Sequence, residues 1–239
     1  PEGFARYAVY EDIKQVKRLQ GSLQLLYDPR PNEFWNTRLD YRHSQANYFA
    51  QPTDLLGATQ WYDIDPYAEK GEAQQNDLNR TTAFVEVNVP FQYNYTITTE
   101  HSGASSLWSK QWRGFRLFLG GDYQMRTYQR EGRFKNGAFL DNSFGLGEQI
   151  AFQTWSAKAG MEISFSPRHQ LLLYGGQFQR PPDLRSVYPN PRENHQFIPA
   201  LVPEETSSLS LAYRWQERHS DLSLKGYWIK QEHVNEVSF

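Results

Sequence analysis

The sequence predicts an all-β protein built as an antiparallel, up-and-down transmembrane β-barrel. Three observations lead to this prediction. About eight short segments place an apolar side chain at every second position, the connections between them alternate in length, and aromatic residues gather beside the short connections. A strand that crosses a bilayer needs only about ten residues of such alternation, so the average hydropathy of the chain can stay low.

The alternating segments are clearest in the second half of the chain. In 206–215 the apolar positions are Leu209, Leu211, Tyr213 and Trp215, and the polar or small positions between them are Ser208, Ser210, Ala212 and Arg214. The pattern continues unbroken over 155–165 and recurs at 83–95 and at 115–125, where Phe118 interrupts it. Weaker copies lie at 19–27, 35–41, 170–178 and 222–228. The enrichment in β-branched and aromatic residues favours strands over helices.

In the segment 83–95 we expect Phe91, Tyr93 and Tyr95 to lie on the apolar face, together with Val85, Val87 and Val89. The positions opposite the apolar ones carry many charged residues throughout the chain: Arg38, Asp40, Glu86, Arg116, Asp122, Arg126, Lys158, Glu162, Arg214 and Lys225. Burying so many charges in a dry core would be prohibitive, so this face contacts water or a polar filler. A soluble antiparallel sheet also has one wet face, and periodicity alone leaves both architectures open.

The connections favour the barrel. They are short at 28–32, 166–169 and 216–221, of medium length at 100–112, and long at 51–80, 135–149 and 183–205. Short turns on one side and long loops on the other are typical of outer-membrane barrels. Tyr27, Trp35, Phe165, Trp215, Trp112 and Phe115 flank the shorter connections and predict an aromatic girdle at one membrane interface.

Composition excludes several classes of protein. The 239 residues include 25 Lys and Arg against 27 Asp and Glu without a long block of one sign, so no nucleic-acid partner is indicated. The absence of cysteine excludes a disulfide framework, a thiolate metal site and a cysteine nucleophile. No apolar run reaches the roughly 18 residues of a spanning helix. The opening residues, PEGFARYAVYED, do not resemble a signal peptide, so we expect the chain to begin after processing or to be part of a longer one.

One stretch of about 65 residues resembles the late barrel strands of TonB-dependent outer-membrane receptors. In that family a strand rises to an aromatic residue, an Arg and Pro-Pro at the outer rim, a loop follows, and Pro-Glu introduces the descending strand. Here these features are Phe178, Arg180, Pro181 and Pro182, followed by Pro203 and Glu204. Two successive prolines also end a strand on physical grounds alone, because proline cannot donate to a ladder of hydrogen bonds.

The resemblance implies a barrel of about 22 strands closed around an N-terminal plug, located in the outer membrane of a Gram-negative cell. It also implies import of a scarce nutrient, energised by an inner-membrane coupling complex of the TonB type. The chain departs from the pattern: it has no recognisable plug and no energy-coupling box, and no aromatic alternation leads back from Phe239. We therefore expect residues 1–239 to form a single barrel segment of about eight strands, without a plug or a separate domain.

Motifs for chemistry are missing from the sequence. No metal-ligand spacing, nucleophile motif or phosphate loop is present, and we predict neither catalysis nor a cofactor. Loops at a barrel mouth are where ligand contacts are expected. The candidate ligand-binding residues are Trp61, Tyr62 and Tyr67 in one long loop and Tyr188, Asn190, Arg192 and His195 in another. Asp63 and Asp65 could hold Ca²⁺, but the EF-hand spacing is absent and a solvated acidic loop is the favoured interpretation.

Three functional hypotheses follow. The preferred one is a segment of a TonB-energised importer of a siderophore, glycan, cobalamin or peptide. The resemblance supplies its partners: the inner-membrane coupling complex, the lipid bilayer, the ligand and, in some members of the family, a surface lipoprotein. The first alternative is a self-contained small outer-membrane barrel with a structural or adhesive role. The second is a soluble sugar-binding β-sandwich.

Overall fold

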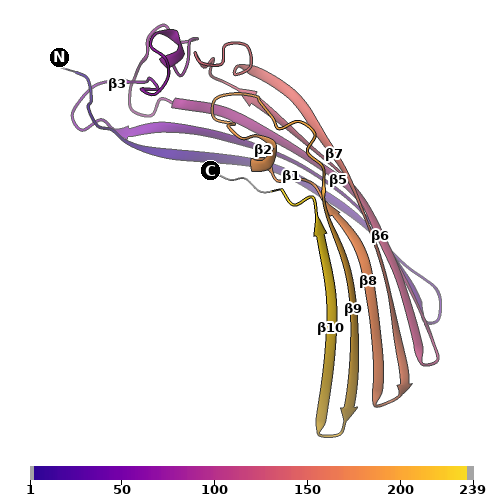
Figure 1. Ribbon diagram of the computed structural model, residues 1–239. Coiled ribbons are helices and arrows are strands. Elements are labelled where there is room, and N and C mark those ends of the chain that lie inside the picture. Colours follow the sequence, from indigo (N-terminus) through magenta and orange to yellow (C-terminus); the bar gives the residue numbers. More distant parts are fainter. Residues whose placement is uncertain (1–2, 236–239) are drawn as a thin grey trace.

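A computed structural model describes residues 3–235 as one curved, eight-stranded antiparallel sheet (Figure 1). Its strands, in the order in which they lie side by side, are β1 (Val9–Arg30), β2 (Glu33–Asp54), β5 (Phe91–Trp112), β6 (Phe115–Gly132), β7 (Gly145–Ser166), β8 (His169–Arg180), β9 (Glu204–Glu217) and β10 (Ser220–Glu232). This is also their order along the chain, so the sheet is an up-and-down meander. The predicted all-β class and the predicted number of strands are confirmed.

The remaining elements lie in the long connections. Strands β3 (Trp61–Tyr62) and β4 (Phe84–Val85) form a separate two-stranded sheet. The short helices are η1 (Glu72–Gln74) and α1 (Leu184–Val187). No helix in residues 3–235 is long and apolar enough to cross a bilayer. The final residues, 236–239, on which the expectation about a terminal strand depended, lie outside the described part of the chain.

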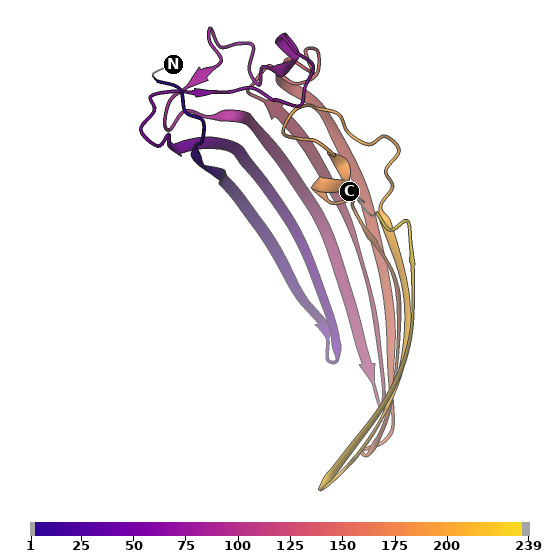
Figure 2. The same ribbon diagram turned by 60° about the vertical axis from the view of Figure 1, so that its left-hand side comes forward.

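Strands β1 and β10 are the two edges of the sheet. They do not pair with each other within the described residues, and the sheet forms an open trough (Figure 2). The eight strands alone therefore do not make a closed barrel. Each edge presents a row of backbone groups that could pair with further strands.

The sequence predicted the connections well except at one place. The segment 100–112, which was expected to be a medium-length link, is the second half of β5, and the strand turns into β6 through Arg113 and Gly114 alone. All four connections at this end have two residues: 31–32, 113–114, 167–168 and 218–219. Asn32 and Gly114 have positive φ, which tight hairpin turns require. The connections at the other end are 55–90, 133–144 and 181–203, so short and long alternate more strictly than predicted.

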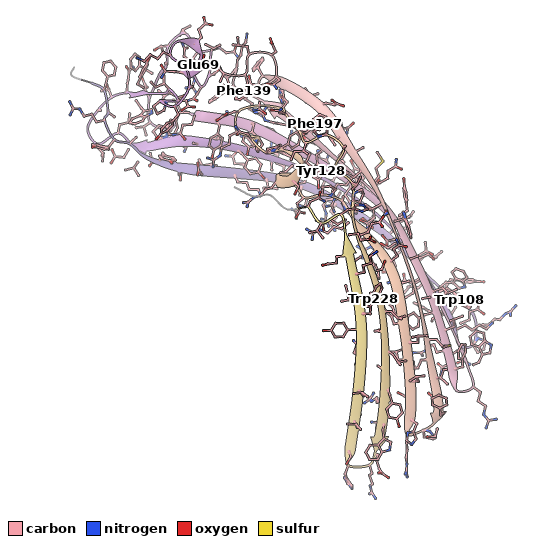
Figure 3. The ribbon with its side chains drawn as sticks, viewed as in Figure 1. Glu69, Trp108, Tyr128, Phe139, Phe197 and Trp228 are labelled. Carbon is pink, nitrogen blue, oxygen red and sulfur yellow. The ribbon has the colours of Figure 1, made fainter. Side chains whose placement is uncertain are left out.

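The register assigns most apolar side chains of the alternating segments to one face, although Leu107, Leu172 and Ile229 lie on the other. Residues directly opposite each other in a ladder share a face, and Leu211 is opposite Leu173, which is opposite Met161, which is opposite Leu117. This face is convex and is not covered by a second layer in residues 3–235; Leu209 and Leu211 are 51% and 49% exposed. Figure 3 shows the same arrangement, with Trp108 projecting from the convex side near the short turns. The prediction of one apolar and one polar face is confirmed for these strands.

The strands are tilted relative to the line that joins the short turns. A ladder row that starts at Arg30, at the end of β1, passes through Lys110 and Leu117 and reaches Gly226, six residues past the start of β10. With a rise of about 3.3 Å per residue and a spacing of about 4.8 Å between strands, this offset corresponds to a tilt of roughly 30°. Membrane barrels have comparable tilts, of about 35–45°.

The expectation that Phe91, Tyr93 and Tyr95 of the segment 83–95 lie on the apolar face is wrong. Phe91, Tyr93 and Tyr95 lie on the concave face and are buried. The ladder between β5 and β6 is regular from Tyr95 to Trp112, so every odd position of β5 in this stretch faces opposite to Trp108. Residues 83–90 belong to the long connection, and the apparent alternation there is unrelated to that of β5. Glu86 accordingly lies in this connection and not on the polar face of the sheet.

Phe118, which interrupts the alternation of β6, has a packing reason. Its ring lies on the concave face over Gly160 of β7, where a Cβ would approach the ring to 1.9 Å. The ring also stacks on Tyr174 of β8 at a centroid distance of 5.9 Å. The aromatic side chain therefore covers a glycine that leaves the neighbouring strand without a side chain to pack.

The small core lies at the long-loop end, where the loops fold over the concave face (Figure 3). It combines strand residues with residues of the connections: Ala50, Val85, Phe91, Tyr93, Tyr95, Ile97, Tyr128, Phe152, Val187 and Tyr188. Strand β8 ends at Arg180, immediately before Pro181 and Pro182, and β9 begins directly after Pro203. These prolines therefore mark the rim, as the sequence predicted.

Candidate ligand-binding site

Aromatic and charged side chains gather on the concave face beneath the long loops. We call this group the mouth cluster. It consists of Asp12 and Lys14 of β1, Tyr48 of β2, Tyr93 and Tyr95 of β5, and Arg192 of the connection 181–203. Strand register accounts for most of it, because Lys14 pairs with Tyr48 and Tyr48 pairs with Tyr95 in adjacent ladders.

The exposed part of the mouth cluster is held together by Tyr93. Its hydroxyl donates to Oδ1 of Asp12 at 2.6 Å, and the Arg192 guanidinium lies 4.5 Å from its ring centroid. Nη2 of Arg192 is also 3.8 Å from Oδ2 of Asp12. Both charged side chains remain more than half exposed, at 56% for Asp12 and 57% for Arg192. A ligand on the concave side could therefore reach a guanidinium and a carboxylate in one place, whereas the Tyr93 ring that holds them is only 6% exposed.

The inner part of the mouth cluster is a stacked pair of tyrosines. The rings of Tyr48 and Tyr95 are 5.1 Å apart and inclined by 12°. The Lys14 ammonium lies 5.2 Å from the Tyr48 centroid, and the Arg130 guanidinium of β6 lies 5.3 Å from that of Tyr95. Cations at such distances from ring centroids are attracted by the ring faces. Tyr95 and Arg130 are buried, so the exposed Lys14 and the partly exposed Tyr48 are the members of this part that a ligand can reach.

Arg130 ties the connection 181–203 to the wall of the sheet. Its side chain is buried, its Nε donates to the Pro191 carbonyl at 2.6 Å, and its Nη1 donates to the Ser143 carbonyl at 3.0 Å and to Nδ1 of His195 at 2.8 Å. Each buried N–H of a guanidinium needs an acceptor, and two separate connections supply them here. The position of Arg192 therefore depends on Arg130.

His195 is neutral in this arrangement. Because Nδ1 accepts from Arg130, the ring proton is on Nε2, which lies 3.3 Å from the Phe144 carbonyl. Burial lowers the pKa of His195, and the neighbouring Arg130 charge lowers it further. Tyr188, on the same connection, is 1% exposed and belongs to the core, and burial raises the pKa of its hydroxyl to about 12. Asn190 donates to Glu193 at 2.7 Å within its own loop.

The candidates in the connection 55–90 are not members of the mouth cluster. Trp61 packs against the core, and Tyr62 packs on Phe84 with centroids 5.1 Å apart. Tyr67 is 95% exposed and is available to a ligand from solution. The structure thus places Arg192 in the mouth cluster and His195 three residues further along the same connection, whereas Tyr62 and Tyr67 are exposed on the connection 55–90.

Asp63 has a structural environment. It is buried; its Oδ1 accepts from Asn76 at 2.7 Å and from the Gln92 backbone at 2.9 Å, and its Oδ2 accepts from Arg80 at 3.1 Å. Burial raises its pKa, and these hydrogen bonds partly offset that effect. Asp65 accepts from the Tyr67 backbone at 2.9 Å. Residues 3–235 contain no group of three or more His, Cys, Asp or Glu that could hold a metal ion, so the weak Ca²⁺ candidate gains no support.

The sequence did not predict Asp12, Lys14 and Tyr48 of the mouth cluster, nor Arg130, which supports it. Tyr93 and Tyr95 were assigned to the other face. A signal was present in β5: counting back from Trp108 and Trp112 along an unbroken strand places both tyrosines on the polar face. Nothing local in the sequence indicates that Arg130 meets His195, which is 65 residues away.

The fold of the chain is similar to that of a known transporter structure. The chain resembles the copper transporter OprC with a TM-score of 0.61 and 13% sequence identity over 91% of its length. It spans 30% of that protein's chain. At this identity the likeness shows the fold alone. No protein-family model matches the sequence, and no curated protein shows significant sequence similarity to it.

Acidification should release the connection 181–203. Protonation of His195 adds a hydrogen to Nδ1, which then cannot accept the hydrogen bond from Arg130. Because the pKa of His195 is lowered in the packed loop, the released loop binds more protons than the packed one. Stability of the packed loop is therefore present above about pH 6.5 and is lost as the pH falls below it. At pH 5.5 we expect a nonspecific protease to cleave within 181–203 up to about ten-fold faster in the wild-type protein than in His195→Gln. The amide oxygen of the introduced glutamine can still accept the hydrogen bond from Arg130.

The matched control for this experiment is His219→Gln, a substitution in an exposed turn, which should keep the full pH response. Protease activity at each pH is calibrated on an unfolded substrate. An identical pH response in wild type and His195→Gln would contradict the assigned tautomer.

Asp63→Ala should loosen the connection 55–90. It leaves Nη1 of Arg80, the Asn76 side-chain amide and the Gln92 backbone amide without the carboxylate that accepts from all three, while Arg80 keeps its contacts with Pro90 and Asp77. Removing one partner of a largely buried charge pair costs roughly 3 kcal/mol. Hydrogen exchange of amides in 55–90 should accelerate accordingly, whereas the exposed Glu69→Ala should leave it unchanged. Equal protection in both variants would show that Asp63 does not organise the loop.

Proposed function

We propose that this chain is part of the barrel wall of an outer-membrane transporter of the TonB-dependent class, which imports a scarce ligand with energy from an inner-membrane coupling complex. The convex face carries the proposal. It presents leucine, tryptophan, tyrosine and methionine side chains across eight strands, and the described residues provide no second layer to cover it. Exposed apolar patches on soluble monomers rarely exceed a few hundred Å². Hydrocarbon is the solvent that suits such a face.

Several further observations support a membrane barrel. The strands tilt by roughly 30°, and short turns and long loops are sorted to opposite ends, as in outer-membrane barrels. The concave face is polar over much of its length, where Asp40 and His101 are 2.8 Å apart and Arg116 and Glu162 are 3.9 Å apart. The fold neighbour OprC is named as a copper transporter. These observations favour a hydrated lumen inside and transport as the activity.

The open edges favour a large barrel over the alternatives. A self-contained barrel requires β1 to pair with β10, and the described sheet leaves both edges free. A sandwich requires a second sheet against the apolar face, and the only other strands of residues 3–235 are the short β3 and β4. Further strands beside β1 and β10 would complete a wall such as the 22-stranded one that the family resemblance implies.

The ligand would enter from the long-loop side. We assign its first contacts to the exposed residues Arg192 and Asp12 of the mouth cluster and to Tyr67 and Tyr62 of the connection 55–90. Siderophore, cobalamin, glycan and peptide ligands all carry groups that this mixture of charge and aromatic surface can bind. Transport in this proposal makes and breaks no covalent bond in the ligand.

A charge on the convex face should prevent membrane assembly, whereas a charge on the concave face should not. Leu211 and Ser210 are adjacent in β9 and point to opposite faces. We expect Leu211→Arg to lower the free energy of unfolding in lipid vesicles by about 2–4 kcal/mol, and Ser210→Arg to change it by less than about 1 kcal/mol. Urea titration with tryptophan fluorescence measures both. Equal losses in the two variants would argue against lipid on one side and water on the other.

Nutrient import is tested by growth. Cells that lack the protein should grow poorly on one member of a panel of ferric siderophores, cobalamin, glycans and peptides as limiting sources, and the wild-type protein should restore growth. Restoration should disappear when the inner-membrane coupling complex is deleted. The substitution Arg192→Ala, Tyr67→Ala or both should raise the ligand concentration needed for half-maximal growth. Growth restored without the coupling complex would instead indicate a passive pore.

A further inference from the structure

The four short turns share a feature that the function proposed above does not explain: each contains or adjoins an arginine. Arg30 immediately precedes the turn 31–32, and Arg113, Arg168 and Arg218 lie within the other three turns. All four side chains are exposed. Every strand that runs toward this end, namely β1, β5, β7 and β9, therefore delivers one guanidinium to the short-turn rim.

The arginines follow aromatic residues at a regular spacing. Three of the strands end in an aromatic residue with Arg three positions later: YDPR at 27–30, FSPR at 165–168 and WQER at 215–218. In β5, Trp112 comes directly before Arg113. Three residues span about 10 Å along a strand, or roughly 8 Å along the axis of a tilted barrel. Aromatic rings mark the edge of the hydrocarbon, and the headgroup layer extends about 5–8 Å beyond it.

Three of these guanidinium groups have no acidic partner. Arg168 pairs with Glu217 at 2.9 Å, whereas Arg30, Arg113 and Arg218 form no ion pair among residues 3–235. The nearby Glu33 is occupied by Trp108 at 3.1 Å and Lys110 at 3.2 Å. Asp221 is likewise occupied, by Arg214. The rim thus keeps unpaired positive charge although acidic residues lie close by.

The two ends of the sheet differ in charge. The longest connection, 55–90, contains six Asp and Glu residues against two Lys and Arg residues. The four short turns contain Arg113, Arg168 and Arg218 and no acidic residue. The difference in charge between the two ends does not come from the net charge of the whole chain, which is only -2.

We propose that the short-turn rim is a binding surface for anionic phospholipid headgroups in the leaflet that it contacts. Neighbouring hairpins are about 10 Å apart in the sheet, so the four arginines span about 30 Å. A single small anion cannot contact all of them, whereas a bilayer surface supplies a phosphate to each. A guanidinium binds phosphate with paired hydrogen bonds, and a juxtamembrane Arg is attracted to an anionic membrane surface. The inference rests on the proposed function in one respect, namely that the convex face contacts lipid.

The test uses the protein in phosphatidylcholine bilayers that contain a trace of spin-labelled lipid. Electron paramagnetic resonance separates lipid that is motionally restricted at the protein surface from bulk lipid. We expect spin-labelled phosphatidylglycerol to associate about two- to five-fold more strongly than spin-labelled phosphatidylcholine. The preference should fall toward one in 1 M NaCl, where the Debye length is about 3 Å.

Two matched triple variants assign the preference to the rim. Arg30→Gln with Arg113→Gln and Arg218→Gln should abolish it. Arg38→Gln with Lys158→Gln and Lys225→Gln removes the same charge from the concave face and should keep it. A third variant, Arg30→Lys with Arg113→Lys and Arg218→Lys, should also retain a preference, and it provides the charge test if the glutamine variant does not fold.

The possible failures are distinguishable. If no restricted lipid of either type is detected, the proposed membrane function fails. If both lipids are restricted equally, the membrane function stands and the headgroup inference is overturned. A preference for phosphatidylglycerol that persists in the glutamine variant of the rim would also overturn it.

Discussion

The structure depends on the solvent beside its convex face. A single sheet satisfies its backbone hydrogen bonds between strands, and the alternation of side chains then separates apolar from polar groups by a distance of only one sheet thickness. Residues such as Leu209 and Tyr123 are exposed on one side, while Asp122 and Lys158 lie on the other. Water beside both faces would leave the apolar side chains exposed to it. Hydrocarbon beside both faces would leave the charged side chains without water or partners. In the proposed membrane barrel, water contacts the polar face and hydrocarbon contacts the apolar face.

The position of the polar features follows from this constraint. The long connections fold onto the concave side, as the proposed membrane barrel requires, because their backbone groups would lack partners in hydrocarbon. There Arg130 supplies donors to Pro191, Ser143 and His195, and these contacts place Arg192 beside Tyr93. Arg192 and its neighbours are thus held on the concave side of the sheet, which contacts water in the proposed barrel. The arginines of the short turns lie at the opposite end, just beyond the aromatic residues that mark the edge of the apolar face.

The sequence predicted the strands correctly where apolar residues on one face alternate with polar residues on the other. It did not predict the faces correctly where loops cover the concave face. Leu211 and Ser210 lie on the predicted faces because the alternation of β9 is strict. The strands extend beyond their apolar stretch, however, and the polar positions of β5 between His101 and Lys110 were mistaken for a link. Tyr95 was given the wrong face because loops cover the concave side at that height and make it apolar there. Contacts such as that of Arg130 with His195 depend on the folding of two distant loops and leave no periodic signal.

The most direct measurement of the central claim is a spin-label scan of β9 in lipid bilayers. The chain contains no cysteine, so single cysteines at each position from 206 to 215 give unambiguous labels. The account predicts that collisions with oxygen, which concentrates in hydrocarbon, peak at 209, 211 and 213, and that collisions with a water-soluble nickel complex peak at 208, 210 and 212. Positions that all respond alike, or oxygen maxima at the serine positions, would contradict it.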